Sequence, residues 1–245
     1  MPATLIVSII SHQQGEMVAA LLDDFERLVP DIPIRITINV PEPHFTSTTK
    51  PSLTFHHNQE PKGFGANHNH ALQGSDADFF CVLNPDICLL DNPFPILLAC
   101  LDNPSVAIAA PQIINSQGQC QDNARHFPTV ISLVKKLFGI HDGRIATDGQ
   151  QALSVPWVAG MFLVIRASAF QSIGGFDEKF FLYYEDVDLC ARLRKSGWQI
   201  RVCPAVKVIH NAQHSSHKSL RYARWHLNSM LRYFLKHPRL PKISP

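Results

Sequence analysis

The first 110 residues of the chain alternate between apolar runs and segments in which apolar residues recur at helical spacing. Runs of apolar and β-branched residues predict strands over residues 5–10, 34–40, 53–56, 79–83 and 106–110. Apolar residues three and four positions apart predict helices over residues 18–29, 66–73 and 94–101. This alternation is typical of an α/β fold with a mostly parallel central sheet flanked by helices.

The second half of the chain is less regular. Polar, turn-rich sequence fills residues 115–128 and 141–155. Four further elements are predicted, namely strands over 158–166 and 199–203 and helices over 185–196 and 220–236. A length of 245 residues fits one large domain with a substantial core.

Charge is distributed unevenly along the chain. The formal net charge of +2 is too balanced to indicate a nucleic-acid partner. Residues 1–210 nevertheless carry 15 basic and 20 acidic side chains, whereas residues 211–245 carry seven basic and no acidic ones. The pattern therefore describes an acidic body with a basic C-terminal segment.

Cysteine usage and the chain's N-terminus indicate a cellular compartment. None of the six cysteines forms a C-x-x-C pair, so a zinc site built from thiolates is not expected. Residues 1–4 lack the basic region of a signal peptide, and no apolar run approaches the roughly 20 residues that cross a bilayer. We therefore expect a reducing, cytoplasmic location.

The tripeptide Asn84-Pro85-Asp86 directly follows the predicted strand over 79–83. Ligands in open α/β sheets gather at the carboxyl ends of strands, and a carboxylate there can hold Mg²⁺ or Mn²⁺ on a diphosphate. The alternative is structural, because Asn-Pro-Asp is also favourable turn sequence.

Three carboxylates, Glu185, Asp186 and Asp188, open the helix predicted after an aromatic run. They complement the helix dipole, which requires no catalytic role. A carboxylate shielded by aromatic rings can also serve as a general base, because burial raises its pKa. Spacing does not decide between these roles.

Two further features are weaker by themselves. His210 ends an apolar strand, where a histidine is either a hydrogen-bonded core residue or a metal ligand. Gly63 and Gly65 precede a predicted helix and could let backbone N–H groups approach a phosphate, but the segment matches no dinucleotide or Walker pattern.

Together these segments resemble the family 2 glycosyltransferases with the GT-A fold over roughly residues 4–237. The matching segments, in family order, are Ser8 with Ser11 and His12, residues 63–67, 83–86, 157–166, 174–178 and 181–190, and His210. The Asn-Pro-Asp tripeptide and the segment Arg224-Trp225-His226-Leu227 are most similar to bacterial rhamnosyltransferases of O-antigen and cell-wall polysaccharide assembly.

The resemblance implies roles for the chemical groups. Asp86 and His210 would bind Mg²⁺ or Mn²⁺, and Asp186 would be the catalytic base with Glu185 beside it. Contacts with the acceptor would come from Trp157, Ala159, Gly160, Tyr184 and Asp188. Contacts with the nucleotide-sugar donor would come from Ser8, Ser11, His12, Asn39, Gly63, Gly65, Asn67, Asn84 and Asp86.

The sequence departs from the family pattern at two of these positions. Relatives commonly have an Asp that contacts the nucleotide base at the position where Asn39 stands in this chain, and Glu42 is nearby in the sequence. Asn84 replaces the first carboxylate of the family's metal motif, and His210 is the residue that can compensate.

The resemblance also implies an organisation and an activity. The expected domain spans 1–237, with a donor half over 1–110, an acceptor half over 111–216, a basic helix over 217–237 and a tail over 238–245. The expected reaction is metal-dependent, inverting transfer of L-rhamnose from dTDP-L-rhamnose to a lipid-linked saccharide. The alternatives are a sugar nucleotidyltransferase, disfavoured because residues 11–15 lack Arg and Lys, and a non-catalytic saccharide-binding protein.

The C-terminal helix predicts a further contact. Its apolar residues, expected to pack on the core, are Leu220, Ala223, Leu227, Met230, Leu231 and Phe234. Its basic flank consists of Arg221, Arg224, Arg232 and Lys236, with Trp225 and Tyr233 between them. That flank is either simply solvated or touches an anionic membrane, where each Lys or Arg contributes about 1 kcal/mol.

Overall fold

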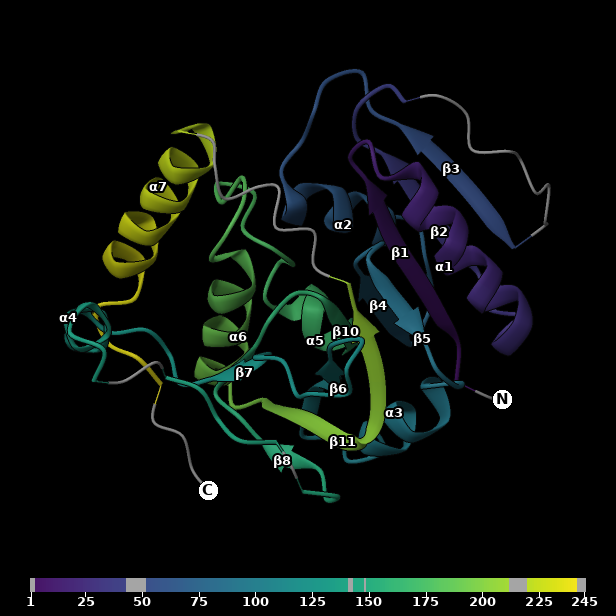
Figure 1. The fold of residues 1–245 in the computed structure, drawn as a ribbon. Coiled ribbons are helices and arrows are strands. Elements are labelled where there is room, and N and C mark those ends of the chain that lie inside the picture. Colours follow the sequence, from purple (N-terminus) through teal and green to yellow (C-terminus); the bar gives the residue numbers. More distant parts are fainter. Residues whose placement is uncertain (1–2, 43–51, 141–142, 148, 212–219, 242–245) are drawn as a thin grey trace.

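The computed structural model describes residues 3–42, 52–140, 143–147, 149–211 and 220–241 (Figure 1). Several predicted segments lie partly outside these ranges, including the turn-rich stretch over 141–155, the first residues of the 217–237 segment and the end of the 238–245 tail.

A nine-stranded mixed sheet forms the centre of the molecule, with the strand order β3-β2-β1-β4-β10-β6-β11-β5 and β8 paired to β11 (Figure 1). The strands are β1 (Leu5–Ser11), β2 (Ile34–Ile38), β3 (Leu53–His57), β4 (Phe79–Leu83), β5 (Ile87–Leu89), β6 (Val106–Ile114), β8 (Leu153–Ser154), β10 (Phe162–Arg166) and β11 (Gln199–His210). Strands β1, β2, β3, β4, β6 and β11 run in one direction, and β5, β8 and β10 run in the other. The predicted α/β architecture with a mostly parallel sheet is confirmed.

Helices cover both faces of the sheet. On one face α1 (Gly15–Leu28) and α3 (Phe94–Cys100) enclose a core that includes Leu21 and Leu97. On the other face α2 (Phe64–Leu72), α5 (Ala167–Ser172) and α6 (Glu185–Lys195) enclose a second core. Two helices, α4 (Val130–Leu137) and α7 (Leu220–Lys236), lie at the periphery (Figure 1).

The apolar run over residues 158–166 is not one strand, contrary to the prediction. It contains the end of β9 (Trp157–Val158), a turn over 159–161, and β10. Strand β9 pairs with β7 (Ala124–Arg125) in a separate two-stranded sheet, whereas β10 pairs with β4 and β6. The break matters because the turn reaches the centre of the candidate site.

Other elements escape the sequence pattern because they are short or interrupted. Strands β5, β7 and β8 and helices α4 and α5 are not predicted. Strand β11 joins the predicted strand over 199–203 and the apolar strand that ends at His210 into one element, with an irregularity between Cys203 and Lys207 that accommodates Pro204. The continuation brings His210 alongside β5.

Helix α7 presents to the core a face that includes the predicted Phe234 but otherwise differs from the one predicted. Its buried residues are Ser229 and Tyr233, and Trp225 stacks on Phe181 with ring centroids 4.7 Å apart. Leu227 and Leu231, predicted to pack inward, are 51% and 52% exposed. The aromatic rings of α7 pack against aromatic rings at the start of α6, which leaves these leucines of α7 exposed to solvent.

Asp188 joins α7 to α6. Its carboxylate is fully buried and accepts from Arg192 Nε at 2.8 Å, Lys236 Nζ at 2.7 Å and His237 Nε2 at 2.8 Å. Burial opposes its ionisation, but the hydrogen bonds and charges of these partners outweigh it and lower the pKa of Asp188 to about 2.

Replacing Asp188 by Asn is expected to lower the free energy of unfolding, because Arg192 and Lys236 lose the counter-charge that the buried carboxylate supplies. The folded-state pKa lies below that of an unfolded Asp, about 3.9. Its stabilisation is therefore present above about pH 4 and is lost as the pH falls through about 2. Urea unfolding between these pH values should show less acid sensitivity in the variant. Asp177→Asn, which removes a more exposed partner of Lys236, should have a smaller effect.

Candidate functional site

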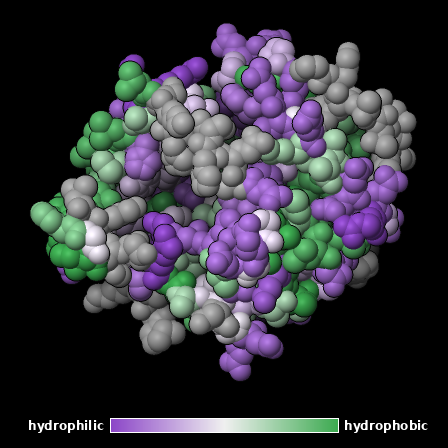
Figure 2. Space-filling model, viewed as in Figure 1, coloured by the Kyte–Doolittle hydropathy of each residue, from purple (hydrophilic) through white to green (hydrophobic). Residues whose placement is uncertain are grey.

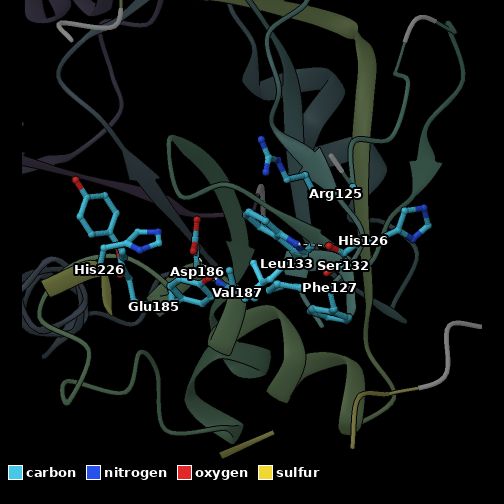
Figure 3. A pocket seen from close by; sticks show the side chains of 14 residues that line it. Arg125, His126, Phe127, Ser132, Leu133, Glu185, Asp186, Val187 and His226 are labelled. Carbon is cyan, nitrogen blue, oxygen red and sulfur yellow. Dashed lines mark hydrogen bonds between the residues drawn. The ribbon is translucent and has the colours of Figure 1, made fainter. Parts of the chain in front are cut away.

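A cavity of about 300 Å³ lies where α4, α6 and α7 approach the β7–β9 sheet (Figure 3). Its lining includes carboxylates, aromatic rings, cationic or imidazole side chains and several smaller apolar or polar residues. The lining residues are Arg125, His126, Phe127, Pro128, Ser132, Leu133, Gly143, Trp157, Tyr183, Tyr184, Glu185, Asp186, Val187 and His226.

Asp186 extends its carboxylate into this cavity (Figure 3). Its Oδ2 accepts from the backbone N–H of Gly160 at 3.0 Å, and its Oδ1 accepts from the backbone N–H of Val187 at 2.7 Å. Burial raises the pKa of Asp186 above its ordinary value, although these hydrogen bonds act in the opposite direction. A fixed carboxylate with a raised pKa, partly open to a cavity, has the properties of a general base.

Glu185 lies beside Asp186 but is less accessible. Its side chain is 6% exposed, and Oε2 finds no hydrogen-bond partner among the described residues. Burial, followed by the nearby charge of Asp186, raises the pKa of Glu185 well above its ordinary value. Glu185 is therefore suited to modulating the charge of Asp186 rather than to reaching a substrate.

Tyr183 and Tyr184 carry the chain into α6 with a strained backbone. Their φ angles are 69° and 65°, in the left-handed region that side chains with a Cβ rarely adopt. Both rings line the cavity and face His226 of α7, with ring centroids 5.3 and 5.4 Å from it. The strain places two aromatic rings at the cavity wall next to Asp186.

Trp157, Ala159 and Gly160, all predicted to contact the acceptor, divide into two groups. Trp157 lines the cavity and donates from Nε1 to the carbonyl oxygen of His126 at 3.0 Å. Ala159 and Gly160 form the turn beneath it, where the Ala159 N–H donates to the Asn123 carbonyl oxygen at 2.8 Å. The backbone N–H of Gly160 thus positions the carboxylate of Asp186.

The same turn connects Asp186 to Asn84. The backbone N–H of Asn84 donates to the carbonyl oxygen of Met161 at 2.9 Å, one residue from the Gly160 N–H that holds Asp186. The end of β4 and the start of α6, separated by a hundred residues of sequence, therefore meet through residues 159–161.

Asp86 and His210 also come together, as predicted. Asp86 Oδ2 lies 3.2 Å from His210 Nε2, and the Asn211 N–H donates to the Asp86 carbonyl oxygen at 2.9 Å. The opposite ring nitrogen, Nδ1 of His210, is 2.8 Å from Gln121 Oε1, while Gln121 Nε2 donates to the His210 carbonyl oxygen at 3.1 Å. Because a glutamine Oε1 can only accept, this geometry places a proton on Nδ1 and directs Nε2 toward Asp86.

These residues fit a divalent cation. Asp86 Oδ1 is buried and has no hydrogen-bond partner among the described residues, so this oxygen is available as a ligand. The described residues contain no group of three or more His, Cys, Asp or Glu side chains arranged to hold a metal. An ion at Asp86 and His210 would complete its shell with diphosphate oxygens and water, as Mg²⁺ sites commonly do.

An amide network occupies the ends of β1, β2 and β3. Asn39 Oδ1 accepts from Asn58 Nδ2 at 2.8 Å and from the Lys62 N–H at 2.9 Å, while Asn39 Nδ2 lies 3.1 Å from His12 Nδ1. Asn58 Nδ2 also donates to Asn67 Oδ1 at 2.7 Å. His12, Asn39 and Asn67, each predicted to contact the donor, thus lie together at these strand ends.

The predicted serines and glycines have packing partners. Ser8 and Ser11 are fully buried; the Ser8 hydroxyl bonds the His68 ring at 2.8 Å, and Ser11 Oγ accepts from the Gln14 N–H. A Cβ at Gly63 would lie 2.7 Å from the Phe181 carbonyl oxygen, and one at Gly65 would lie 2.6 Å from Phe176 Cβ. Both glycines let α2 approach the segment before α6.

The structure separates one predicted acceptor residue from the rest and adds others. Asp188 is not among the described residues that line the cavity, because it binds the charged end of α7. Arg125, Tyr183 and His226 line the cavity but were not predicted as site residues. His226 belongs to the segment Arg224–Leu227, which could have indicated it.

This fold and site define a class of enzyme. The chain belongs to glycosyltransferase family 2, because the family model described as "Glycosyltransferase like family 2" matches residues 6–228. It is thus a glycosyltransferase, and the predicted family is confirmed.

Curated relatives give this membership more detail. The chain is 30% identical over 186 residues to Rhamnosyltransferase WbbL of Escherichia coli K12, covering 71% of this chain and 70% of that protein. It is 33% identical over 149 residues to N-acetylglucosaminyl-diphospho-decaprenol L-rhamnosyltransferase of Mycobacterium tuberculosis. That match covers 57% of this chain and 48% of the mycobacterial protein, so the chain spans about half of this relative's length.

Solved structures confirm the GT-A fold. GalNAc-T7, determined with UDP, GalNAc and Mn²⁺, gives a TM-score of 0.73 at 14% identity, over 95% of this chain and 48% of that one. The mannosyltransferase PcManGT of Pyrobaculum calidifontis, determined with GDP-Man and Mn²⁺, gives 0.65 at 13% identity, over 98% and 66%. At this level of identity the two comparisons show a shared fold and nothing beyond it.

Proposed function

We propose that this glycosyltransferase moves L-rhamnose from dTDP-L-rhamnose to a lipid-linked saccharide during synthesis of a bacterial surface polysaccharide. The choice of sugar rests on the relatives named as rhamnosyltransferases, and the lipid-linked acceptor on the mycobacterial relative's name. The observation that carries the reaction is the Asp186 carboxylate, which enters the cavity and is held by Gly160.

Asp186 takes the proton from the acceptor hydroxyl as that oxygen attacks the anomeric carbon. The bond from this carbon to the nucleoside diphosphate breaks in the same displacement, so the configuration inverts. The backbone N–H groups of Gly160 and Val187 fix the direction of the carboxylate, and the rings of Trp157 and Tyr184 offer apolar surface to the acceptor sugar. This route involves no covalent enzyme intermediate.

Asp86 and His210 are the residues that would hold Mg²⁺ or Mn²⁺. When bound, the ion supplies charge neutralisation to the departing diphosphate. Asn84 ties this end of β4 to the turn that holds Asp186, which keeps the donor and acceptor sides of the site in a fixed relation.

A panel of sugar nucleotides tests the proposal. With Mn²⁺ present, dTDP-L-rhamnose should raise the melting temperature more than UDP- or GDP-linked sugars, because a ligand that binds the native state stabilises it. Transfer to a soluble N-acetylglucosaminyl-diphospho-lipid analogue should release dTDP and form an inverted linkage. Release of diphosphate from dTTP and a sugar phosphate would instead identify a nucleotidyltransferase. Saccharide binding without turnover of any donor would identify a non-catalytic protein.

Gln121 is predicted to set the metal affinity by fixing the His210 ring. Replacing Gln121 by Leu should weaken Mn²⁺ binding about 10- to 100-fold, as expected for loss of a hydrogen bond that orients a ligand. Calorimetric titration of Mn²⁺ in the presence of dTDP measures this without turnover. Gln117→Leu, in an exposed turn nearby, should bind Mn²⁺ like the unmodified protein; equal affinity in the Gln121 variant would contradict the assignment.

A further inference from the structure

Two peripheral helices present apolar side chains to solvent. On α4 the exposed apolar residues are Val130, Ile131 and Val134, with Phe138 and Ile140 just beyond, and they are 48–74% exposed. On α7 they are Leu220, Leu227, Leu231 and Leu235, which are 51–91% exposed. We call these nine residues the α4–α7 apolar surface. Figure 2 shows hydrophobic surface over both helices on the same side of the molecule.

The charged residues on the two helices have one sign. Helix α4 contains Lys135, and α7 contains Arg221, Arg224 and Arg232 together with Lys236, whereas neither helix contains an acidic residue. Arg224 and Lys135 are exposed. Of the basic residues of α7, Lys236 is neutralised within the protein by Asp177 and Asp188. A partner that covers both the leucines and the arginines must therefore combine apolar and anionic groups.

The surface also borders the cavity. Ser132 and Leu133 of α4 and His226 of α7 line the cavity that contains Asp186, while the neighbouring residues on each helix belong to the α4–α7 apolar surface. A planar partner that contacts both helices would thus lie next to the cavity that holds the base.

We propose that the α4–α7 apolar surface docks this protein on an anionic lipid bilayer, with the cavity placed at the level of the lipid headgroups. The inference deepens the proposed function, because a saccharide on a diphospho-lipid is presented at that level. Leucine, isoleucine and phenylalanine side chains enter the interface, and Arg and Lys side chains contact lipid phosphates. Among the described residues no helix has the length and apolar character to cross the bilayer.

Charge argues against a second copy of the chain as the occupant. Two copies related by a two-fold axis would place the α7 arginines of one against those of the other, with no acidic residue on either helix to compensate. A bilayer rich in anionic lipid supplies both the negative charge and the apolar interior. Self-association becomes an outcome of the test.

Flotation with lipid vesicles provides the test. The unmodified protein should bind vesicles of phosphatidylglycerol and phosphatidylethanolamine, and binding to phosphatidylcholine vesicles should be weaker and less sensitive to salt. The pair Leu231→Ser and Leu235→Ser on α7, and the pair Ile131→Ser and Phe138→Ser on α4, should each lower the partition coefficient about tenfold or more. The pair Leu90→Ser and Ile96→Ser removes exposed apolar side chains near α3 and should leave binding unchanged.

Three readouts separate this proposal from its alternatives. Circular dichroism melting confirms that each variant folds, and transfer to a soluble acceptor should be the same in all of them. Absence of vesicle binding by the unmodified protein would overturn the proposal, as would equal binding by all variants. A dimer in light scattering that both serine pairs convert to a monomer would assign the surface to a second copy. Vesicle binding without any sugar transfer would retain the docking and reject the proposed function.

Discussion

Asp186→Asn is expected to reduce kcat by about 100- to 10,000-fold, the range associated with loss of a general base. The amide keeps the size of the carboxylate and can still accept from the Gly160 N–H, so the cavity should remain intact. Donor affinity, measured by calorimetry with dTDP-L-rhamnose and Mn²⁺, should be close to that of the unmodified protein. The fall in transfer rate should therefore appear in kcat rather than in binding.

The pH dependence of transfer gives an independent check on this base. Burial raises the pKa of Asp186, so the carboxyl group takes up a proton at a higher pH than an ordinary Asp does. Only the ionised form accepts the proton of the acceptor, so the rate should fall with decreasing pH along a limb above the usual carboxyl range. In Asp186→Asn this limb should disappear from the residual rate.

Glu185→Gln is the matched control for Asp186→Asn. It replaces a buried carboxyl group, whose pKa burial and the charge of Asp186 raise, with a neutral amide and leaves the base in place, so transfer should persist. The acid limb, which belongs to Asp186, should therefore remain in this variant. Loss of transfer in Glu185→Gln, with full transfer in Asp186→Asn, would reverse the roles of the two residues.

Much of the fold follows from local pattern. The continuous apolar runs of the buried strands β1, β4 and β6 and the helical spacing of α1 and α6 are strong signals, and each element overlaps its predicted range. The turn at 159–161 could not be predicted, because Val158 to Arg166 is apolar throughout and its break depends on the separate partners of β9 and β10. The spacing of apolar residues in the sequence shows which side chains can be buried, but it does not show which neighbouring element covers them.

Helix α7 illustrates that limit. Its sequence offers both a leucine stripe and an aromatic stripe, and pattern analysis selected the leucines. The aromatic stripe packs inward because Phe181 and Tyr184 provide rings that stack on Trp225 and Tyr233. Those partners lie some forty residues earlier in the sequence and are brought together only by the fold.

The candidate site likewise contains some residues that the sequence reveals and others that only the fold reveals. Asp86, His210 and Asp186 could be identified because carboxylates and histidine at element ends are chemically distinctive. Asp188 has the same chemistry and spacing but turns toward His237 and Lys236, which no local signal reveals. Gln121 and Asn58 were missed because amide side chains carry no signal of their own until the residues that they orient are known.

Asp86→Asn is expected to weaken Mn²⁺-supported binding of dTDP-L-rhamnose about 100-fold or more. Loss of an outer-shell hydrogen bond costs about 10- to 100-fold in metal affinity, and removal of a direct carboxylate ligand should cost at least the upper value. The affinity for dTDP-L-rhamnose without Mn²⁺ should change little, because the Asn211 N–H binds the backbone oxygen of Asp86, which the substitution retains. Calorimetry with and without Mn²⁺ separates the two affinities.

The Asp86–His210 contact has an alternative explanation as a structural ion pair, and the same variant distinguishes the two. A structural pair predicts that Asp86→Asn lowers the melting temperature without Mn²⁺, because the 3.2 Å contact to His210 Nε2 loses its charge. A metal site predicts an unchanged melting temperature without Mn²⁺ and a smaller rise when Mn²⁺ and dTDP are added. Asp91→Asn, on the exposed turn after β5, should behave like the unmodified protein in both conditions. A destabilised Asp86 variant that keeps its full response to Mn²⁺ would assign the pair to the fold and remove it from the donor site.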